Sequence, residues 1–449
     1  MEFVFDWEQE EKDDDAVLEV AMAELVSSSE EEAEEERTWG GSTPGRRSNK
    51  KRDFQAAYAQ LLKDYFNGTE STYDERDFER RFRVPRDVFN LVYDKIVGVE
   101  EPFVVKKDAV GRVGIHPLVR LVACFRHIGY GDALDREDEN LCLSESSLQV
   151  AVQAFCKLVV KHFGAEYLNR SPSDEEKLKI HAVNTKRGFP GLFASWDCKH
   201  FIWHRCPMVW AGQYSGHALG GQNSLILEAI ADYQRYIWYV NFGDAGSAND
   251  INTLDRSSIV GAMLEGSLDM TCPVEYEING TRRDWMYYLT DGIYPEWGIF
   301  VKTFSDPRGA KQKVFSKQQE FARKDVECAF GILVKEFHIL AQPLLKWYLE
   351  DITDILECCI ILHNMSIALT GDTTILDPEE AEAEAAAARG RRRKWPIFSG
   401  SVIDEDIILA DGADLFAARS SNFNTGMQSS VNHYALKRDL TEHLYSQFG

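Results

Sequence analysis

The spacing of apolar residues changes once along this chain, near Gly191, and this change limits the folds that the chain can adopt. Before that point apolar residues recur at intervals of three and four, which is the spacing of an amphipathic helix. The segments with this spacing are residues 54–66, 84–97, 116–131 and 144–163. We therefore expect an all-α domain over residues 54–190.

After Gly191 short apolar runs predict strands instead of helices. A helix is expected near residues 250–265, and a long helical run, 317–337, follows the last strand. The order β-β-β-α-β-β-α matches an α/β fold of the ribonuclease H-like kind, with a mixed five-stranded sheet, over residues 191–368. The predicted strands are residues 192–198, 224–232, 236–244, 286–292 and 299–304.

One helix pair in the first domain has two interpretations. Ser144 is a candidate N-cap for the helix over 144–163, and the polar connection before it gives a helix, turn, helix outline. Such a pair can enter the major groove of DNA. Most helix pairs at this spacing only form core, so the sequence leaves both interpretations open.

The net charge of −23 is concentrated at the ends of the chain. Residues 1–37 hold 16 acidic and 2 basic side chains, and residues 366–449 hold 13 and 8, which leaves −4 for the 328 residues between them. A nearly neutral central part can carry a local basic face, so the overall acidity does not exclude a nucleic-acid partner.

Both ends have the composition of tails. Residues 1–53 are predicted to be disordered, and residues 369–449 to be low-complexity and irregular. Each contains a basic run, at residues 46–52 and 389–394. Such a run is either a solvated linker or a functional segment, namely a nuclear import signal or a phosphate-contacting arm.

The acidic start is unlike a signal peptide, and no apolar run approaches the length of a membrane span, so we expect a soluble intracellular protein. The nine cysteines lack CxxC spacing and are predicted to be reduced and mostly buried.

Three carboxylates are placed where the predicted strands and helix would bring them together. Asp197 is expected at the end of the first strand, Asp291 at the end of the fourth, and Glu327 on the late helix. Two-metal phosphoryl transfer needs acidic oxygens that hold two Mg²⁺ or Mn²⁺ ions about 4 Å apart. A single Asp after a strand is usually a cap or turn residue. Three at matching places favour a catalytic metal site.

Asp250, in a Gly-rich turn at a helix start, is a fourth metal-ligand candidate or else an acid of the first helical turn. Just past Asp197, Lys199 and Arg205 are candidate DNA contacts, and His200 and His204 lie between them in the sequence. The aromatic residues of this half are expected mainly in the sheet core. They are Trp196, Phe201, Trp203, Trp210, Trp238 and Trp285.

Several ordered blocks of this half resemble the PIF/Harbinger transposases, particularly their plant-type transposon protein group. The blocks are residues 187–216, 223–257, 287–307, 315–340 and 358–365. The resemblance runs from Tyr58 to Met365, because residues 77–92 and the acidic stretch 132–139 also resemble the family's helical region.

The resemblance implies a DDE transposase whose acids are Asp197 in SWDCKH, Asp291 in LTDGIY and Glu327 in DVECAFG. Asp250 matches a pair that some alignments treat as the second acid, so the choice between Asp250 and Asp291 stays open. Cys328 stands where Arg is common, which affects local packing more than catalysis.

The family cuts and joins DNA with two Mg²⁺ or Mn²⁺ ions, often acts in the nucleus with a Myb-like partner, and is expected to be a homo-oligomer when active, with no membrane. The alternative is a domesticated DNA-binding or scaffold protein that keeps the fold without transposing. A cellular ribonuclease H-like hydrolase is a third interpretation, and the family blocks disfavour it.

Overall fold

The computed structural model describes residues 50, 52–107, 111, 113–216, 219–265, 268, 270–370 and 426–449. The predictions for the acidic tail, for both basic runs and for most of residues 369–449 lie outside them. From Asp53 onward the chain forms one compact unit.

The first part is all-α, as predicted. Ser144 accepts a hydrogen bond from the Ser147 amide and so caps the longest helix of this region, which confirms the predicted helix start. The helices are α2 (Phe54–Tyr65), α3 (Glu75–Phe82), α4 (Arg86–Ile96), α5 (Pro117–Tyr130), α6 (Arg136–Leu141), α7 (Glu145–Tyr167) and α8 (Asp174–Lys186).

The second part is built on a mixed sheet in the order β3-β2-β1-β6-β7. The first three strands are antiparallel, whereas β6 runs parallel to β1 and β7 parallel to β6. This gives the five predicted strands in one sheet. They are β1 (Leu192–Ile202), β2 (Ser224–Ala231), β3 (Ile237–Ala245), β6 (Tyr287–Thr290) and β7 (Phe300–Lys302).

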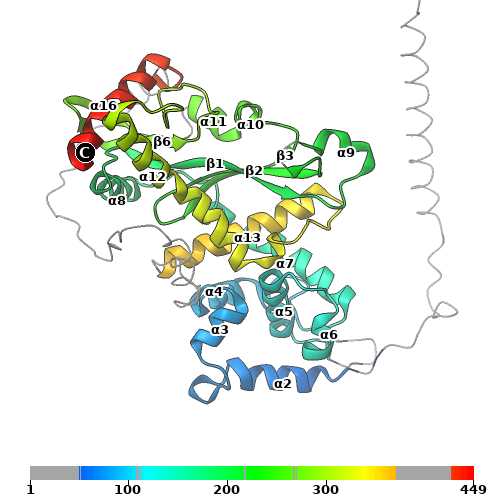
Figure 1. Cartoon of the computed structure of the whole chain (residues 1–449). Helices are drawn as coiled ribbons and strands as arrows, with labels where there is room; N and C mark the ends of the chain where they lie inside the picture. Colours follow the sequence, from blue (N-terminus) through cyan, green and yellow to red (C-terminus); the bar gives the residue numbers. More distant parts are fainter. Residues whose placement is uncertain are drawn as a thin grey trace, which may run out of the picture. The chain divides into compact units, whose positions relative to one another are not determined.

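Helices cover both faces of the sheet. Figure 1 shows α10 (Asp250–Arg256) and α11 (Ser258–Leu264) above it and α13 (Leu349–Thr370) below it. α12 (Gly309–Glu336) packs against β1, β2 and β6, and α9 (Met208–Tyr214) lies beyond the end of the sheet (Figure 1). The single helix expected near residues 250–265 is therefore two short helices.

α13 joins the two parts of the molecule. By length and composition it is the one helix of the described residues that would suffice to cross a membrane, but 72% of its most apolar window is buried in the protein. It packs against α7, and Asn364 ties it to the sheet, since its side chain accepts from the Ile237 amide at 2.9 Å and donates to the Tyr167 carbonyl at 2.7 Å. Packing inside the core thus accounts for its apolar character.

Two elements depart from the sequence prediction. A hairpin of β4 (Thr271–Ile278) and β5 (Thr281–Trp285) turns at Asn279 and Gly280, both with positive φ, a signal typical of tight hairpins. Instead of an irregular C-terminus, α16 (Ser430–Phe448) packs against α12 and β7.

The helical pattern of α16 is hidden because polar side chains are buried among its apolar ones. His433 Nδ1 lies 2.8 Å from the Phe300 carbonyl oxygen, and Asp439 accepts from Arg283 of β5 at 2.5 Å. Each of these groups needs a partner from a distant part of the chain, and local periodicity does not predict such partners.

Candidate acidic site at the centre of the sheet

Asp197 lies in the middle of β1, not at its end as predicted. Side chains alternate along a strand, and Ser195, on the same face, donates to the Ala322 carbonyl of α12. Asp197 therefore faces α12, where its Oδ2 accepts from Arg323 at 3.0 Å. The strand extends further because residues after Asp197 keep pairing with β2 as far as Ile202 with Ser224.

Asp291 is brought beside Asp197 by strand register. β1 and β6 are parallel, with Ser195 opposite Leu289, so two residues further on each strand come Asp197 and Asp291. Asp291 is the first residue after β6, as predicted, and its Oδ1 accepts from the Ile293 amide at 2.8 Å. This contact closes the turn that follows the strand.

Glu327 lies on α12, as predicted, one helical turn beyond Arg323. Its Oε1 is 2.7 Å from Arg323 Nη2. The Arg323 guanidinium therefore bridges Asp197 and Glu327. Sequence reasoning missed this arginine, although its spacing of four residues from Glu327 is the signal of a helical ion pair.

The carboxylates interact electrostatically. The pKa of Asp197 is raised to about 6, mainly by burial; the Cys198 amide and Arg323 act in the opposite direction, and the charges of Asp291 and Glu327 contribute to the rise. A buried acid with like charges beside it is unfavourable unless a cation compensates for it. Such crowding is common at functional sites.

Asp250 lies on the opposite face of β1, because it interacts with Cys198 and His200, whose side chains alternate with that of Asp197 along the strand. It is the first residue of α10, and Asn249 is the N-cap. Burial raises its pKa, and so does Asp291, whereas His200 lowers it. Asp291 thus interacts with both Asp197 and Asp250 from the edge of the sheet.

The predicted cations lie in different surroundings. Lys199 shares the face of Asp197, and its Nζ is 5.7 Å from the Phe201 ring centroid. Arg205 and His204 are exposed in the turn between β1 and α9. His200 points to the other face, with Nδ1 3.1 Å from Ser224 Oγ.

The aromatic prediction holds for most positions. Trp196, Phe201, Trp203 and Trp238 are buried in the two hydrophobic cores, Trp285 is half-buried, and Trp210 is exposed.

Glu228 is a buried acid that the sequence analysis did not single out. It lies on β2 opposite Cys198, is fully buried, and accepts from Trp196 Nε1 at 2.9 Å. Its pKa is raised to about 7, mainly by burial and in smaller part by the charges of Asp244 and Asp250, against the hydrogen bonds from Ser257 and Trp196. A charged residue inside the apolar run LILEAIAD was the available signal.

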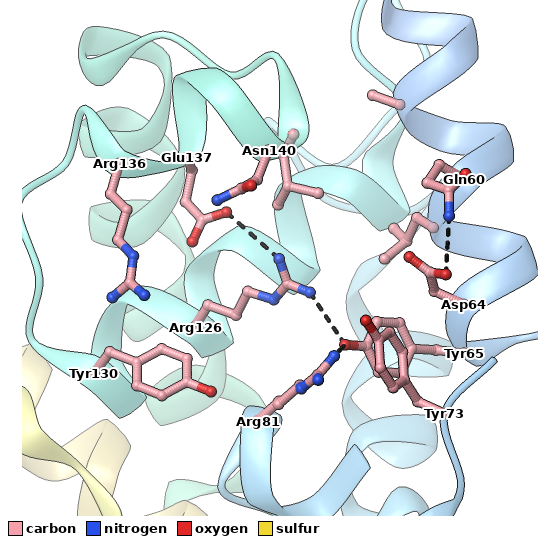
Figure 2. A pocket seen from close by; sticks show the side chains of 13 residues that line it. Gln60, Asp64, Tyr65, Tyr73, Arg81, Arg126, Tyr130, Arg136, Glu137 and Asn140 are labelled. Atoms are coloured by element: carbon pink, nitrogen blue, oxygen red, sulfur yellow. Dashed lines mark hydrogen bonds and ion pairs between the residues drawn. The ribbon is translucent and has the colours of Figure 1, made fainter. Parts of the chain in front are cut away.

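A separate cavity of about 350 Å³ lies in the helical part (Figure 2). Arg126 lies there between Tyr65, whose hydroxyl oxygen is 3.5 Å away, and Glu137, at 3.6 Å. Arg81 donates to the same hydroxyl and stacks on the Tyr73 ring at 3.7 Å. These contacts brace α2, α3, α5 and α6 against one another, and the acidic residues of the sheet are not part of this cavity.

The cysteines agree with the prediction of reduced thiols. All nine are free, five of them buried, and Cys328 is exposed on α12.

Fold and site together define a mixed α/β protein in which acidic residues gather where β1, β6 and α12 meet. Residues 165–374 match the family described as plant transposon protein, and residues 58–97 match a domain of unknown function. This match covers the sheet region and supports a plant-type transposon protein, which indicates a transposase-related function. None of the curated proteins or solved structures compared with the chain matches it.

Proposed function

We propose that this protein is a DDE-type nuclease and strand transferase with a ribonuclease H-like catalytic domain. The observation that carries the proposal is the electrostatic coupling of Asp197 to Asp291 and Glu327, which come from β1, β6 and α12. The strand order, with an antiparallel meander extended by two parallel strands, supports the fold assignment. The transposon family supports the substrate, DNA.

The donor set fits a hard divalent cation by its chemistry, since carboxylate oxygens are the ligands that Mg²⁺ and Mn²⁺ prefer. The set is not preassembled. Among the described residues no three His, Cys, Asp or Glu side chains are close enough to share an ion, and Arg323 contacts the oxygens of both Asp197 and Glu327. We infer that a cation would replace this guanidinium as the compensating charge.

Asp197, Asp291 and Glu327 are the proposed ligands of two Mg²⁺ or Mn²⁺ ions. Bound there, such ions supply charge stabilisation at phosphorus and activate water, and later a 3′ hydroxyl, as the nucleophile. Arg323, released from the carboxylates, would be free to donate to the scissile phosphate. We expect Lys199, on the same face as Asp197, to contact the DNA backbone, and Arg205 to extend this contact beyond the strand.

We assign the second acid to Asp291 and not to Asp250. Asp291 interacts with Asp197 at the centre of the site, whereas β1 separates Asp250 from the face that carries Asp197 and Glu327. In this proposal Asp250 acts only through its charge, which lies near that of Asp291. We expect D250N to lower cleavage about tenfold and D291N to abolish it.

The alternative, a domesticated DNA-binding or scaffold protein, is favoured by one observation. Arg323 already pairs with Asp197 and Glu327, as a structural ion pair would. Action in the nucleus, a Myb-like partner and a homo-oligomeric active form remain parts of the proposal that derive from the family.

A cleavage assay with the full chain tests the proposal. A labelled duplex carrying the element's ends, or a supercoiled plasmid, is incubated with Mg²⁺, Mn²⁺, Ca²⁺ or EDTA, with and without the partner. We expect cleavage in Mg²⁺ and Mn²⁺, and binding with little cleavage in Ca²⁺, whose larger shell suits the geometry poorly. DNA binding without cleavage under every metal condition would favour the scaffold.

A further inference from the structure

An apolar patch is exposed beyond the end of β1. It consists of Met208, Val209 and Trp210 on α9 and of Leu345, Trp347 and Tyr348 in the loop before α13. Their exposed fractions range from 45% to 92%. Trp210 and Trp347 are the exposed tryptophans of the described residues, and contiguous exposed apolar surface usually marks a binding site.

Trp203 holds the two segments of the patch together. Its own ring is buried, its Nε1 donates to the Lys346 carbonyl at 2.9 Å, and its ring centroid is 6.1 Å from that of Trp210. The backbone adds two bonds, from Leu344 N to Ile202 O at 2.8 Å and from His204 N to Leu344 O at 3.1 Å. The exposed rings are thus carried by a braced scaffold.

The patch is also connected to the turn that precedes Asp250. Ser247, in the turn between β3 and α10, donates to the Gln213 carbonyl of α9 at 2.5 Å. The backbones of this turn and of the segment after α9 approach so closely that a Cβ on Gly216 would lie 1.9 Å from the Gly246 carbonyl oxygen. The same turn leads directly into Asp250.

Three cations lie around the patch. Lys199, Arg205 and Lys346 lie along β1 and the two segments, and none of them is in an ion pair of the described residues. The acids nearby are Asp244, which is paired with Arg256, and Glu350 and Asp351 in the first turn of α13. Unpaired cations beside exposed aromatic rings are the combination that single-stranded nucleic acids bind, through backbone charge and base stacking.

We propose that this patch binds a DNA strand with unpaired bases, which stack on Trp210 and Trp347 while Arg205 and Lys199 contact its phosphates. The inference rests on the proposed function, because it takes DNA as the substrate. Six residue steps lead along β1 from Asp197 to Trp203, about 20 Å at roughly 3.3 Å each. That length corresponds to about six stacked nucleotides, so the bound bases lie about six positions from the cleaved bond.

The test is fluorescence anisotropy of the full-length protein with a labelled dT20 strand and a 20-base-pair duplex, both in EDTA. The double variant W210A/W347A is compared with Y434A, which removes a similarly exposed aromatic ring from α16. We expect dT20 affinity to fall about tenfold for each tryptophan, with the duplex much less affected and Y434A unchanged. R205A should instead reduce the slope of log affinity against log salt by about 0.7, which the tryptophan changes leave intact.

Two results would overturn the proposal. One is a W210A/W347A variant whose dT20 affinity stays within twofold of the wild type, or whose affinity falls equally for dT20 and for the duplex. The other is a wild-type oligomer that W347A dissociates in light scattering with unchanged dT20 binding, which would make the patch an interface between copies. EDTA separates this test from catalysis. Strand binding by the patch without cleavage in Mg²⁺ would refute the proposed nuclease and leave the patch, whereas cleavage in Mg²⁺ together with either result above would refute the patch and leave the nuclease.

Discussion

The helical part and the sheet part of this molecule both bury charge, but they compensate for it differently. In the helical cavity Arg126 has an acid, Glu137, and a tyrosine hydroxyl as partners (Figure 2). In the sheet region Asp197 and Glu327 share one guanidinium, that of Arg323, and the charge of Asp291 acts on Asp197 as well.

The difference separates a stabilising network from a functional one. Paired charges hold helices together, and removal of one partner destabilises the protein because the other charge stays buried without compensation. Carboxylates close together at the centre of a sheet lower the stability of the protein unless a cation is bound. Such clusters are therefore typical of functional sites. Substitutions in the two parts should therefore have effects of opposite sign.

The largest expected contrast is in catalysis. D197N, D291N and E327Q should each lower DNA cleavage on the order of 1000-fold, because each removes a ligand charge, and leave folding intact. R126M, assayed at a temperature where it is folded, should retain cleavage. Gel assays in Mg²⁺ measure this, with D306N, an exposed acid paired to Arg308, as control. Normal turnover by the three acidic-site variants would remove the assignment.

The next effect is on stability in the helical part. R126M should lower the free energy of unfolding by about 2–3 kcal/mol, since Glu137 stays buried without its partner. R136M changes an arginine of the same cavity whose side chain is half exposed, and should cost less than about 1 kcal/mol. Urea denaturation compares them. Equal losses would show that burial of the pair does not matter.

In the sheet part, removal of a charge should increase the free energy of unfolding, and the size of this increase should depend on pH. The pKa of Asp197, about 6, lies above its ordinary value, so without metal the free energy of unfolding falls as pH rises from about 4 to about 6. D197N avoids this penalty and should be about 1–3 kcal/mol more stable than wild type at pH 7.5, with little gain near pH 4.

The matched control is D439N. Hydrogen bonds from Arg283 outweigh the effect of burial and hold the pKa of Asp439 below its ordinary value. The ionised Asp439 therefore stabilises the folded protein at neutral pH, and this stabilisation is lost as pH falls through the lowered pKa. We expect D439N to lower the free energy of unfolding at pH 7.5. Urea denaturation in EDTA across pH decides the matter: a D197N variant less stable than wild type at pH 7.5 would contradict the crowding argument.

The smallest effect concerns the compensating cation. R323Q removes the group that competes for oxygens of Asp197 and Glu327, so apparent Mg²⁺ affinity should rise about threefold to tenfold. Calorimetric titration measures this against R308Q, an exposed arginine with a local partner. A lower affinity would mean that Arg323 orients the carboxylates instead of competing for them.

Much of the fold was predictable because its signals are local. The change of spacing near Gly191 separated helices from strands, and all five strands of the sheet were found. Asp291 and Glu327 were placed on the correct elements because each is fixed by one strand or helix. Asp197 was assigned to a strand end because it is a charged residue after an apolar run, whereas pairing with β2 extends the strand to Ile202.

The sequence alone determined the periodicities, the order of elements and the acidic motifs, since these depend on residues near one another in the chain. Only the tertiary structure decided which carboxylates face each other, because parallel register aligns Asp291 with Asp197 while α10 places Asp250 beside Cys198 and His200, on the other face of β1. It also supplied partners for the buried polar groups of α16 and joined α9 to the loop before α13 through Trp203. These contacts link residues more than a hundred positions apart, and no local pattern encodes such a distance.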